Sequence, residues 1–141
     1  MAKKINLKQS GLKVTVPRIK ILKMLESALR RHWSAEDIYK ELEKSGENVS
    51  LATVYRVLLQ FEAADIVERQ RFDGDHSVFE IKTDSHHDHI VCTQCGQVRE
   101  FLDYTIETRQ KDIATRLGFL LTDHRLHLYG LCKDCQWNKR S

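Results

Sequence analysis

The chain has 141 residues, of which 41% are hydrophobic, so it can bury a core as one domain or as two small ones. No apolar run approaches the roughly 20 residues that span a bilayer, and the N-terminus lacks the apolar stretch and cleavage site of a secretory signal. These features argue against a membrane protein and favour a cytoplasmic one. In that reducing compartment, the 4 cysteines indicate metal or redox chemistry rather than structural disulfides.

The formal net charge is only +3, but its distribution along the chain is uneven. Between Met1 and Met24 there are seven Lys or Arg residues and no Asp or Glu. Such a basic arm suits a polyanion, although a solubilising tail would have the same composition.

The first half of the chain has the pattern of three helices. Thr15, Val16 and Pro17 open the first, because proline is favoured in a first helical turn. Ser34 caps a second helix that ends near Gly46.

Ser50 caps the third helix, which spans Leu51 to Phe61. Its apolar stripe consists of Leu51, Val54, Val57, Leu58 and Phe61. At about 100° per residue, Thr53 and Arg56 point away from this stripe and Tyr55 lies on its flank.

A β-hairpin follows the third helix. Residues 66–72 and 76–81 form its strands, and Asp73-Gly74 forms the turn because this pair accepts positive φ angles. Three helices followed by a hairpin predict a winged helix-turn-helix with residues 51–61 as the recognition helix. Arg56 can bind a phosphate or a guanine edge, and Tyr55 can contact a thymine methyl group. An ordinary helical domain with one amphipathic helix has the same pattern and stays an alternative.

The second half begins after a short polar stretch, Lys82 to Ser85. We expect strands at residues 89–92 and 97–102, a helix that Gly118 ends, and a strand over the alternating residues 124–131. This order predicts a small α/β domain.

The four cysteines form two Cys-x-x-Cys pairs that are far apart in the sequence. Cys92 and Cys95 form the first pair, and Cys132 and Cys135 form the second. Two such pairs supply the four thiolates of a tetrahedral structural zinc site. A redox pair is the alternative, but it requires only one Cys-x-x-Cys and leaves the other unexplained.

Metal-capable side chains also cluster just before the first cysteine pair, in the segment His86-His87-Asp88-His89. If this segment is extended, His86 and Asp88 lie on one face and His87 and His89 on the other, so it can serve two sites. Imidazole and carboxylate together favour zinc, iron, manganese or cobalt over calcium or magnesium. A chance cluster in a surface loop stays an alternative.

Taken together, these motifs resemble the ferric uptake regulator family. The resemblance extends from about residue 7 to residue 135 and rests on GLKVT-PR (11–18), SAEDIY (34–39), LATVYRVL-QF (51–61), SVFE (77–80), HHDH (86–89), CxxCG (92–96) and LYG-C (128–132). It implies a homodimeric repressor, or a higher oligomer, that binds palindromic, AT-rich DNA operators of iron-uptake genes when Fe(II) is plentiful. It also implies an α+β chain with a winged-helix DNA-binding domain at 1–82, a linker at 83–85 and an α/β dimerisation and metal-binding domain at 86–141.

The resemblance also implies a role for individual residues. The regulatory Fe(II) site falls on His32, Glu80, His87, His89 and Glu100. A second site falls on His86, Asp88, Glu107 and His124, and the structural Zn(II) site falls on the four cysteines. The DNA-binding residues are Lys13, Arg18, Thr53, Tyr55 and Arg56. Mn(II), Co(II) or Zn(II) can replace Fe(II) in vitro, because nitrogen and carboxylate ligands do not select iron by themselves.

Two branches of the family and two other protein classes are alternatives. The peroxide-sensing branch has aspartate where Glu80 and Glu100 stand here, which disfavours it, whereas a zinc-responsive uptake regulator stays open. A zinc enzyme needs an open coordination position, and these sites have four or five side-chain ligands. A metal-storage protein would not explain Tyr55 and Arg56 on a capped helix.

Overall fold

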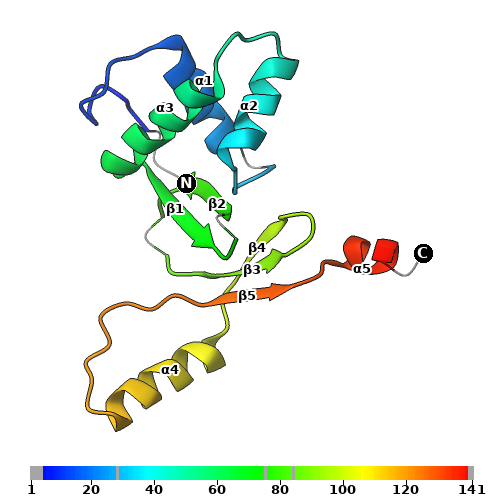
Figure 1. The fold of residues 1–141 in the computed structure, drawn as a ribbon. Helices are drawn as coiled ribbons and strands as arrows, with labels where there is room; N and C mark the ends of the chain where they lie inside the picture. The colour runs from blue at the N-terminus through cyan, green and yellow to red at the C-terminus, as the bar shows by residue number, and fades with distance from the viewer. Residues whose placement is uncertain (1–4, 28, 75, 84, 140–141) are drawn as a thin grey trace. The chain divides into compact units, whose positions relative to one another are not determined.

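The computed structural model describes residues 5–27, 29–74, 76–83 and 85–139. The chain divides into two compact units, Met1–Thr83 and Asp84–Ser141. Figure 1 shows the helices and strands of both units.

The N-terminal unit contains the three predicted helices. They are α1 (Val16–Leu25), α2 (Ala35–Lys44) and α3 (Leu51–Ala63). Each begins at a hydroxyl residue whose side chain accepts a backbone N–H from the first turn, namely Thr15, Ser34 and Ser50. These caps satisfy N–H groups that have no partner inside the helix, which is why the helix starts could be predicted.

A single apolar core holds these helices together. It contains Leu7, Ile21, Leu22, Leu25, Trp33, Ala35, Ile38, Leu42, Val54, Val57, Leu58, Phe61, Ile66, Val67 and Phe79. Four of the five residues predicted for the α3 stripe are buried, but the inclusion of Leu51 was wrong because its side chain is 39% exposed. Leu51 occupies the first helical position next to the Ser50 cap, one turn before the helix face enters the core.

The hairpin consists of β1 (Val67–Phe72) and β2 (His76–Ile81), paired antiparallel with Phe72 opposite His76. The strands predicted at 66–72 and 76–81 agree with the observed strands to within one residue, and Asp73 and Gly74 lie between them as predicted. Gly74 has φ = 79°, a left-handed conformation that glycine adopts without a steric penalty. The prediction of a winged helix-turn-helix, with three helices followed by a hairpin, is confirmed.

One short contact joins the loop between α1 and α2 to the hairpin. Trp33 and Phe79 form an isolated antiparallel bridge in which each backbone N–H donates to the other residue's carbonyl, at 3.0 and 2.7 Å. The bridge makes the residues next to this pair, His32 and Glu80, close neighbours.

The C-terminal unit is built on a three-stranded sheet with the order β4-β3-β5. Its strands are β3 (Asp88–Cys92), β4 (Val98–Phe101) and β5 (His127–Gly130). β4 pairs antiparallel and β5 pairs parallel to β3. The helix α4 (Tyr104–Arg116) begins at the cap Asp103 and connects β4 to β5.

Two predictions for this unit need correction. The predicted strand over 124–131 was too long, because His127 pairs with His89 near the start of β3 and the residues before His127 have little strand left to pair with. The short helix α5 (Lys133–Lys139) was not predicted, since seven residues carry too little periodicity to indicate a helix. The end of the previous helix was predicted well: Gly118, with φ = 80°, follows the C-cap Leu117 of α4.

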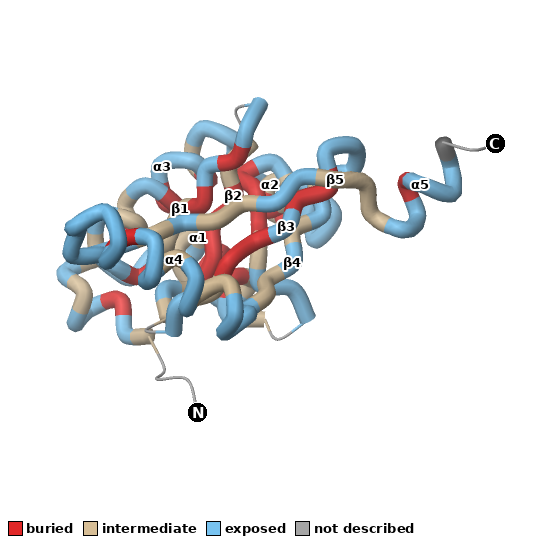
Figure 2. Tube along the Cα trace, turned by 90° about the horizontal axis from the view of Figure 1, so that it is seen from below, coloured by how far each residue is buried: buried red, intermediate tan, exposed pale blue. Residues whose placement is uncertain are grey.

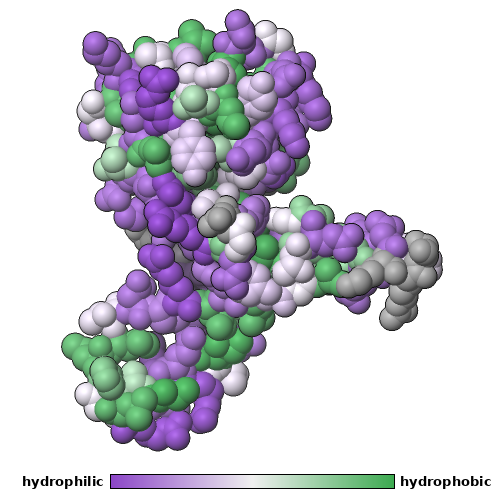
Figure 3. All heavy atoms as spheres, in the orientation of Figure 1, coloured by the Kyte–Doolittle hydropathy of each residue, from purple (hydrophilic) through white to green (hydrophobic). Residues whose placement is uncertain are grey.

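The C-terminal unit buries little apolar surface. Its buried apolar residues are Val91, Cys92, Ala114 and Cys135, and buried positions in Figure 2 include β3. Large apolar side chains lie exposed on α4 and the segment after it, at Tyr104, Ile113, Leu117, Phe119 and Leu120. These residues contribute to the hydrophobic surface seen in Figure 3. Among the described residues, no helix is both long and apolar enough to cross a membrane.

Candidate metal centres and nucleic-acid interface

The four cysteines come together in the C-terminal unit. Cys92 ends β3, Cys95 lies in the turn between β3 and β4, and Cys132 and Cys135 stand before and within α5. The four sulfur atoms all lie within 4.8 Å of one another, and the Cys95 and Cys132 Sγ atoms are 3.8 Å apart. None of the four forms a disulfide. The chemistry and the spacing of this donor set fit a tetrahedral zinc ion.

The surrounding backbone favours thiolate at one of these cysteines. The backbone N–H groups of Cys132 and Cys95 point at the Cys92 Sγ, at 3.4 and 3.5 Å. The Cys132 contact is the main reason that the pKa of the Cys92 thiol falls to about 6. The pKa of Cys135 rises to about 12, because Cys132 and then burial both favour its protonated form. Without a cation, four adjacent sulfurs cannot all ionise, which is the electrostatic condition that a metal ion relieves.

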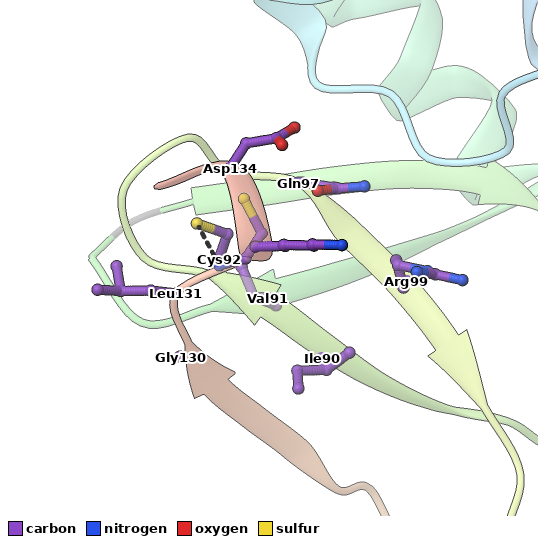
Figure 4. Close-up of a pocket in the computed structure, with 10 residues that line it drawn as sticks. Ile90, Val91, Cys92, Gln97, Arg99, Gly130, Leu131 and Asp134 are labelled. Carbon is purple, nitrogen blue, oxygen red and sulfur yellow. Dashed lines mark hydrogen bonds between the residues drawn. The ribbon is translucent and has the colours of Figure 1, made fainter. Parts of the chain in front are cut away.

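A pocket of about 440 Å³ opens beside this cluster, between β3, β4 and the start of α5 (Figure 4). Its lining combines apolar side chains such as Ile90 and Leu131 with the charged Arg99 and Asp134. No histidine lines it.

A second cluster in the same unit contains imidazole and carboxylate groups. His86 Nε2 lies 3.1 Å from an Asp88 oxygen and 3.3 Å from a Glu107 oxygen. His124 Nε2 lies 2.7 Å from the other Glu107 oxygen. Ligand atoms of these four residues lie within 4.8 Å of one another, and Asp88 is only 1% exposed. The Asp88 Oδ2 atom has no hydrogen-bond partner among the described residues, as expected for a ligand that a cation would contact.

Different elements supply these four ligands. His86 precedes β3, Asp88 opens it, Glu107 is in the first turn of α4, and His124 lies between α4 and β5. The Asp103 cap, whose side chain accepts the N–H groups of Thr105 and Ile106, fixes the turn that carries Glu107. A cation here would connect the helix to the sheet.

The remaining predicted ligands of the C-terminal unit lie together on β3 and β4. The rings of His87 and His89 are 4.9 Å apart, and His87 Nε2 is 3.3 Å from a Glu100 oxygen. His89 pairs with Glu100 in the β3–β4 register. His127 lies opposite His89 on β5, with ring centroids 5.9 Å apart. No sequence motif indicates a role for His127, because its place beside His89 depends on the parallel pairing of β5.

The other two predicted regulatory ligands lie together in the N-terminal unit. His32 Nε2 is 2.9 Å from Glu80 Oε2, and the two side chains are 9% and 1% exposed. The Trp33–Phe79 bridge holds this pair, and Arg30 Nε donates to the His32 carbonyl at 2.9 Å. A buried imidazole and carboxylate of this kind can supply two ligands to a transition-metal ion.

The exposed face of α3 contains the residues predicted to contact DNA. Tyr55 and Arg56 are exposed, and the Arg56 guanidinium lies 3.5 Å from the Thr53 hydroxyl oxygen. The Tyr55 ring packs edge-on against Phe79 at 6.3 Å, which limits its freedom before any DNA contact. A positioned aromatic ring and a guanidinium on one helix face suit a major groove.

Arg18 is held within the unit by three hydrogen bonds. Its guanidinium donates to the Gln60 side-chain oxygen at 3.3 and 2.7 Å and to the Lys13 carbonyl at 2.9 Å. Arg18 therefore connects the segment containing Lys13 to α3. The exposed Lys13 side chain remains available for a polyanion.

Comparisons with known proteins agree with this arrangement. The model of the ferric uptake regulator family matches residues 9–129. A ferric uptake regulation protein from Legionella pneumophila is 58% identical over 130 residues, which cover 92% of this chain and 96% of the relative.

Solved structures of the same kind of protein resemble this one. The Vibrio cholerae ferric uptake regulator has a TM-score of 0.83 and 56% identity, and the match covers 89% of this chain and 96% of that one. The Francisella tularensis ferric uptake regulator, solved with iron, has a TM-score of 0.84 and 40% identity. This match covers 93% of this chain and 99% of that one. Proteins of this kind are transcription regulators rather than enzymes. The family match over most of the chain confirms the resemblance predicted from the motifs: this chain belongs to the ferric uptake regulator family.

Proposed function

We propose that this chain is an Fe(II)-responsive transcriptional repressor that binds palindromic, AT-rich operators of iron-uptake genes as a homodimer. The observation that carries the proposal is a ligand set divided between the two units. His32 and Glu80 are paired in the N-terminal unit, and His87, His89 and Glu100 are grouped in the C-terminal unit. The family resemblance assigns all five to one regulatory site.

The division of this ligand set suggests how metal controls DNA binding. Without metal, the two DNA-binding units of a dimer would adopt many relative orientations, few of which match two half-sites. A bound ion would take ligands from both parts of this set. The population of the binding-competent form then rises according to how much more tightly that form binds the ion.

The other sites have supporting roles in this proposal. The four cysteines hold Zn(II), which fastens the end of the chain to β3. His86, Asp88, Glu107 and His124 form a second site, which stabilises the C-terminal unit. Iron at the regulatory site agrees with the iron-bound relative from Francisella tularensis. Ligand chemistry alone also admits Mn(II), Co(II) and Zn(II), so cellular availability selects the ion.

The DNA contacts follow from the surface of the N-terminal unit. Lys13 enters a minor groove, Tyr55 contacts a thymine methyl group, and Arg56 and Thr53 bind the backbone. Arg18 contributes by fixing the Lys13 segment against α3. A dimer presents two such surfaces, and its symmetry explains a palindromic operator.

The exposed apolar side chains of α4 and residues 117–120 support a homodimer, and higher oligomers can build on it. A contiguous apolar surface of this kind is unusual in a monomer. Four cysteines without a disulfide fit a reducing cytoplasm, where this repressor would meet its operator. A catalytic role is not proposed, because four or five side chains occupy the coordination positions of each site.

Operator binding in the absence of oxygen tests the proposal. Zinc-loaded protein should bind a labelled palindromic operator weakly without added metal and at least tenfold more tightly with Fe(II) or Mn(II). A scrambled duplex of the same composition is the control. Deletion of the gene should raise transcription of iron-uptake genes in iron-replete cells. Derepression of zinc-uptake genes instead would identify a zinc-responsive regulator, and metal-independent operator binding would contradict the proposal.

A further inference from the structure

A buried glutamine contacts the regulatory carboxylate of the N-terminal unit. Gln70, on β1, is 7% exposed, although other polar side chains of this strand reach solvent. Its amide Nε2 donates to Glu80 Oε1 at 3.3 Å, and Glu80 itself is 1% exposed. Burying an amide costs free energy unless it is hydrogen-bonded, so apolar packing does not explain a glutamine here.

The strand register creates this contact. Gln70 pairs with Val78 and Glu68 pairs with Glu80, so Gln70 and Glu80 are diagonal neighbours on one face of the hairpin. Long side chains can reach across that diagonal. The contact therefore follows from the hairpin backbone and does not depend on any flexible loop.

The two oxygens of Glu80 have different neighbours. Oε1 accepts the hydrogen bond from Gln70, and Oε2 lies 2.9 Å from His32 Nε2. The amide thus fixes the rotation of the carboxylate about its last bond and directs one oxygen toward the imidazole. A lysine or arginine could do the same, but its positive charge would oppose a cation. A neutral donor orients the carboxylate and leaves its negative charge for the metal.

We propose that Gln70 is a positioning residue of the regulatory metal site, acting through Glu80 to set metal affinity. The inference rests on the proposed function, in which Glu80 is a ligand. Groups that orient metal ligands typically change affinity by about 10- to 100-fold when removed. Gln70→Met keeps the length and volume of the side chain and removes the donor, so it should weaken binding at this site by about tenfold or more.

Co(II) titration of the zinc-loaded full chain measures this directly through the visible absorption of the bound ion. Wild-type protein should show two transitions, one for each site that does not use cysteine. Gln70→Met should shift the regulatory transition to higher Co(II) concentration and alter the shape of its absorption band. The other transition should stay unchanged. A merely structural role would change the unfolding temperature without changing the band.

Three further variants make the result unambiguous. Gln9→Met removes the amide of an exposed glutamine in the same unit, and should leave both Co(II) transitions in place. Gln70→Asn shortens the reach by one methylene group and should also weaken the regulatory transition, which covers the case in which Gln70→Met does not fold. Glu80→Gln should abolish that transition.

The outcomes separate the two levels of the proposal. If Glu80→Gln leaves both transitions intact, Glu80 is not a ligand and the proposed regulatory site is wrong. If Glu80→Gln abolishes one transition but Gln70→Met and Gln70→Asn leave its affinity within twofold of wild type, only the role of Gln70 is overturned.

Discussion

The two units of this chain are stabilised in different ways. The N-terminal unit encloses an apolar core in which Phe61, Ile38 and Leu58 are fully buried. The C-terminal unit has few buried apolar residues and instead gathers clusters of metal-capable side chains, while Phe119 and Leu120 lie exposed. A unit that buries so little apolar surface needs metal ions or a partner subunit for stability. We therefore expect the N-terminal unit to fold on its own and the C-terminal unit to depend on bound metal or a partner subunit.

Removal of the structural zinc should have the largest effect. Cys132→Ser breaks the cluster that joins the end of the chain to β3, and zinc contributes on the order of 10 kcal/mol in small zinc-dependent domains. We expect loss of dimers in sedimentation and loss of hydrogen-exchange protection in β3 and β5, with protection in α1 to α3 retained. Gln94→Ala, between two cysteines but not a ligand, is the control. A stable dimer with one zinc per chain in the Cys132→Ser variant would refute the cysteine site.

Truncation of the N-terminal core should have the next largest effect, and should leave the other unit intact. Phe61→Ala leaves a cavity in a fully buried position, and such changes cost about 3–5 kcal/mol. Thermal unfolding should show a lower transition temperature for the N-terminal unit with unchanged zinc content. Leu59→Ala, on the same helix but 40% exposed, should cost much less. Equal losses for both variants would show that the core assignment fails.

Substitution on the exposed face of α3 should have the smallest effect on stability and act on DNA binding alone. Arg56→Ala removes a phosphate contact, so operator and non-operator affinities should fall together and the salt dependence should decrease by about one unit of slope. Tyr55→Ala should mainly relax the preference for thymine at its position. Salt titrations of both variants test this, and an unchanged slope in Arg56→Ala would contradict the phosphate contact.

Features that local chemistry determines could be predicted from the sequence. Ser34 and Ser50 begin helices because their hydroxyl groups satisfy free N–H groups, and Cys-x-x-Cys spacing constrains two thiols wherever it occurs. The side-chain alternation in residues 86–89 anticipated that His86 lies near Asp88 and His87 near His89. Such patterns depend on a few neighbouring residues.

Features that depend on long-range pairing were predicted less well. The length of β5 is set by the extent of β3, and α5 is too short to show periodicity. The contact of Gln70 with Glu80 was not predicted, because it joins residues of two strands and depends on their pairing register. The ligand sets came from family resemblance, since no spacing rule connects His32 to Glu80 or Glu107 to His124.

The central claim is that metal controls DNA binding through ligands from both units, and two matched variants test it most directly. His89→Ala removes a regulatory ligand, and His124→Ala removes a ligand of the site contained within the C-terminal unit. Operator affinity is titrated with Fe(II) and Mn(II) under anaerobic conditions for both variants and the wild type. We expect His89→Ala to lose the metal response and His124→Ala to keep most of it. A normal response in His89→Ala together with no response in His124→Ala would show that the switch lies in the other site.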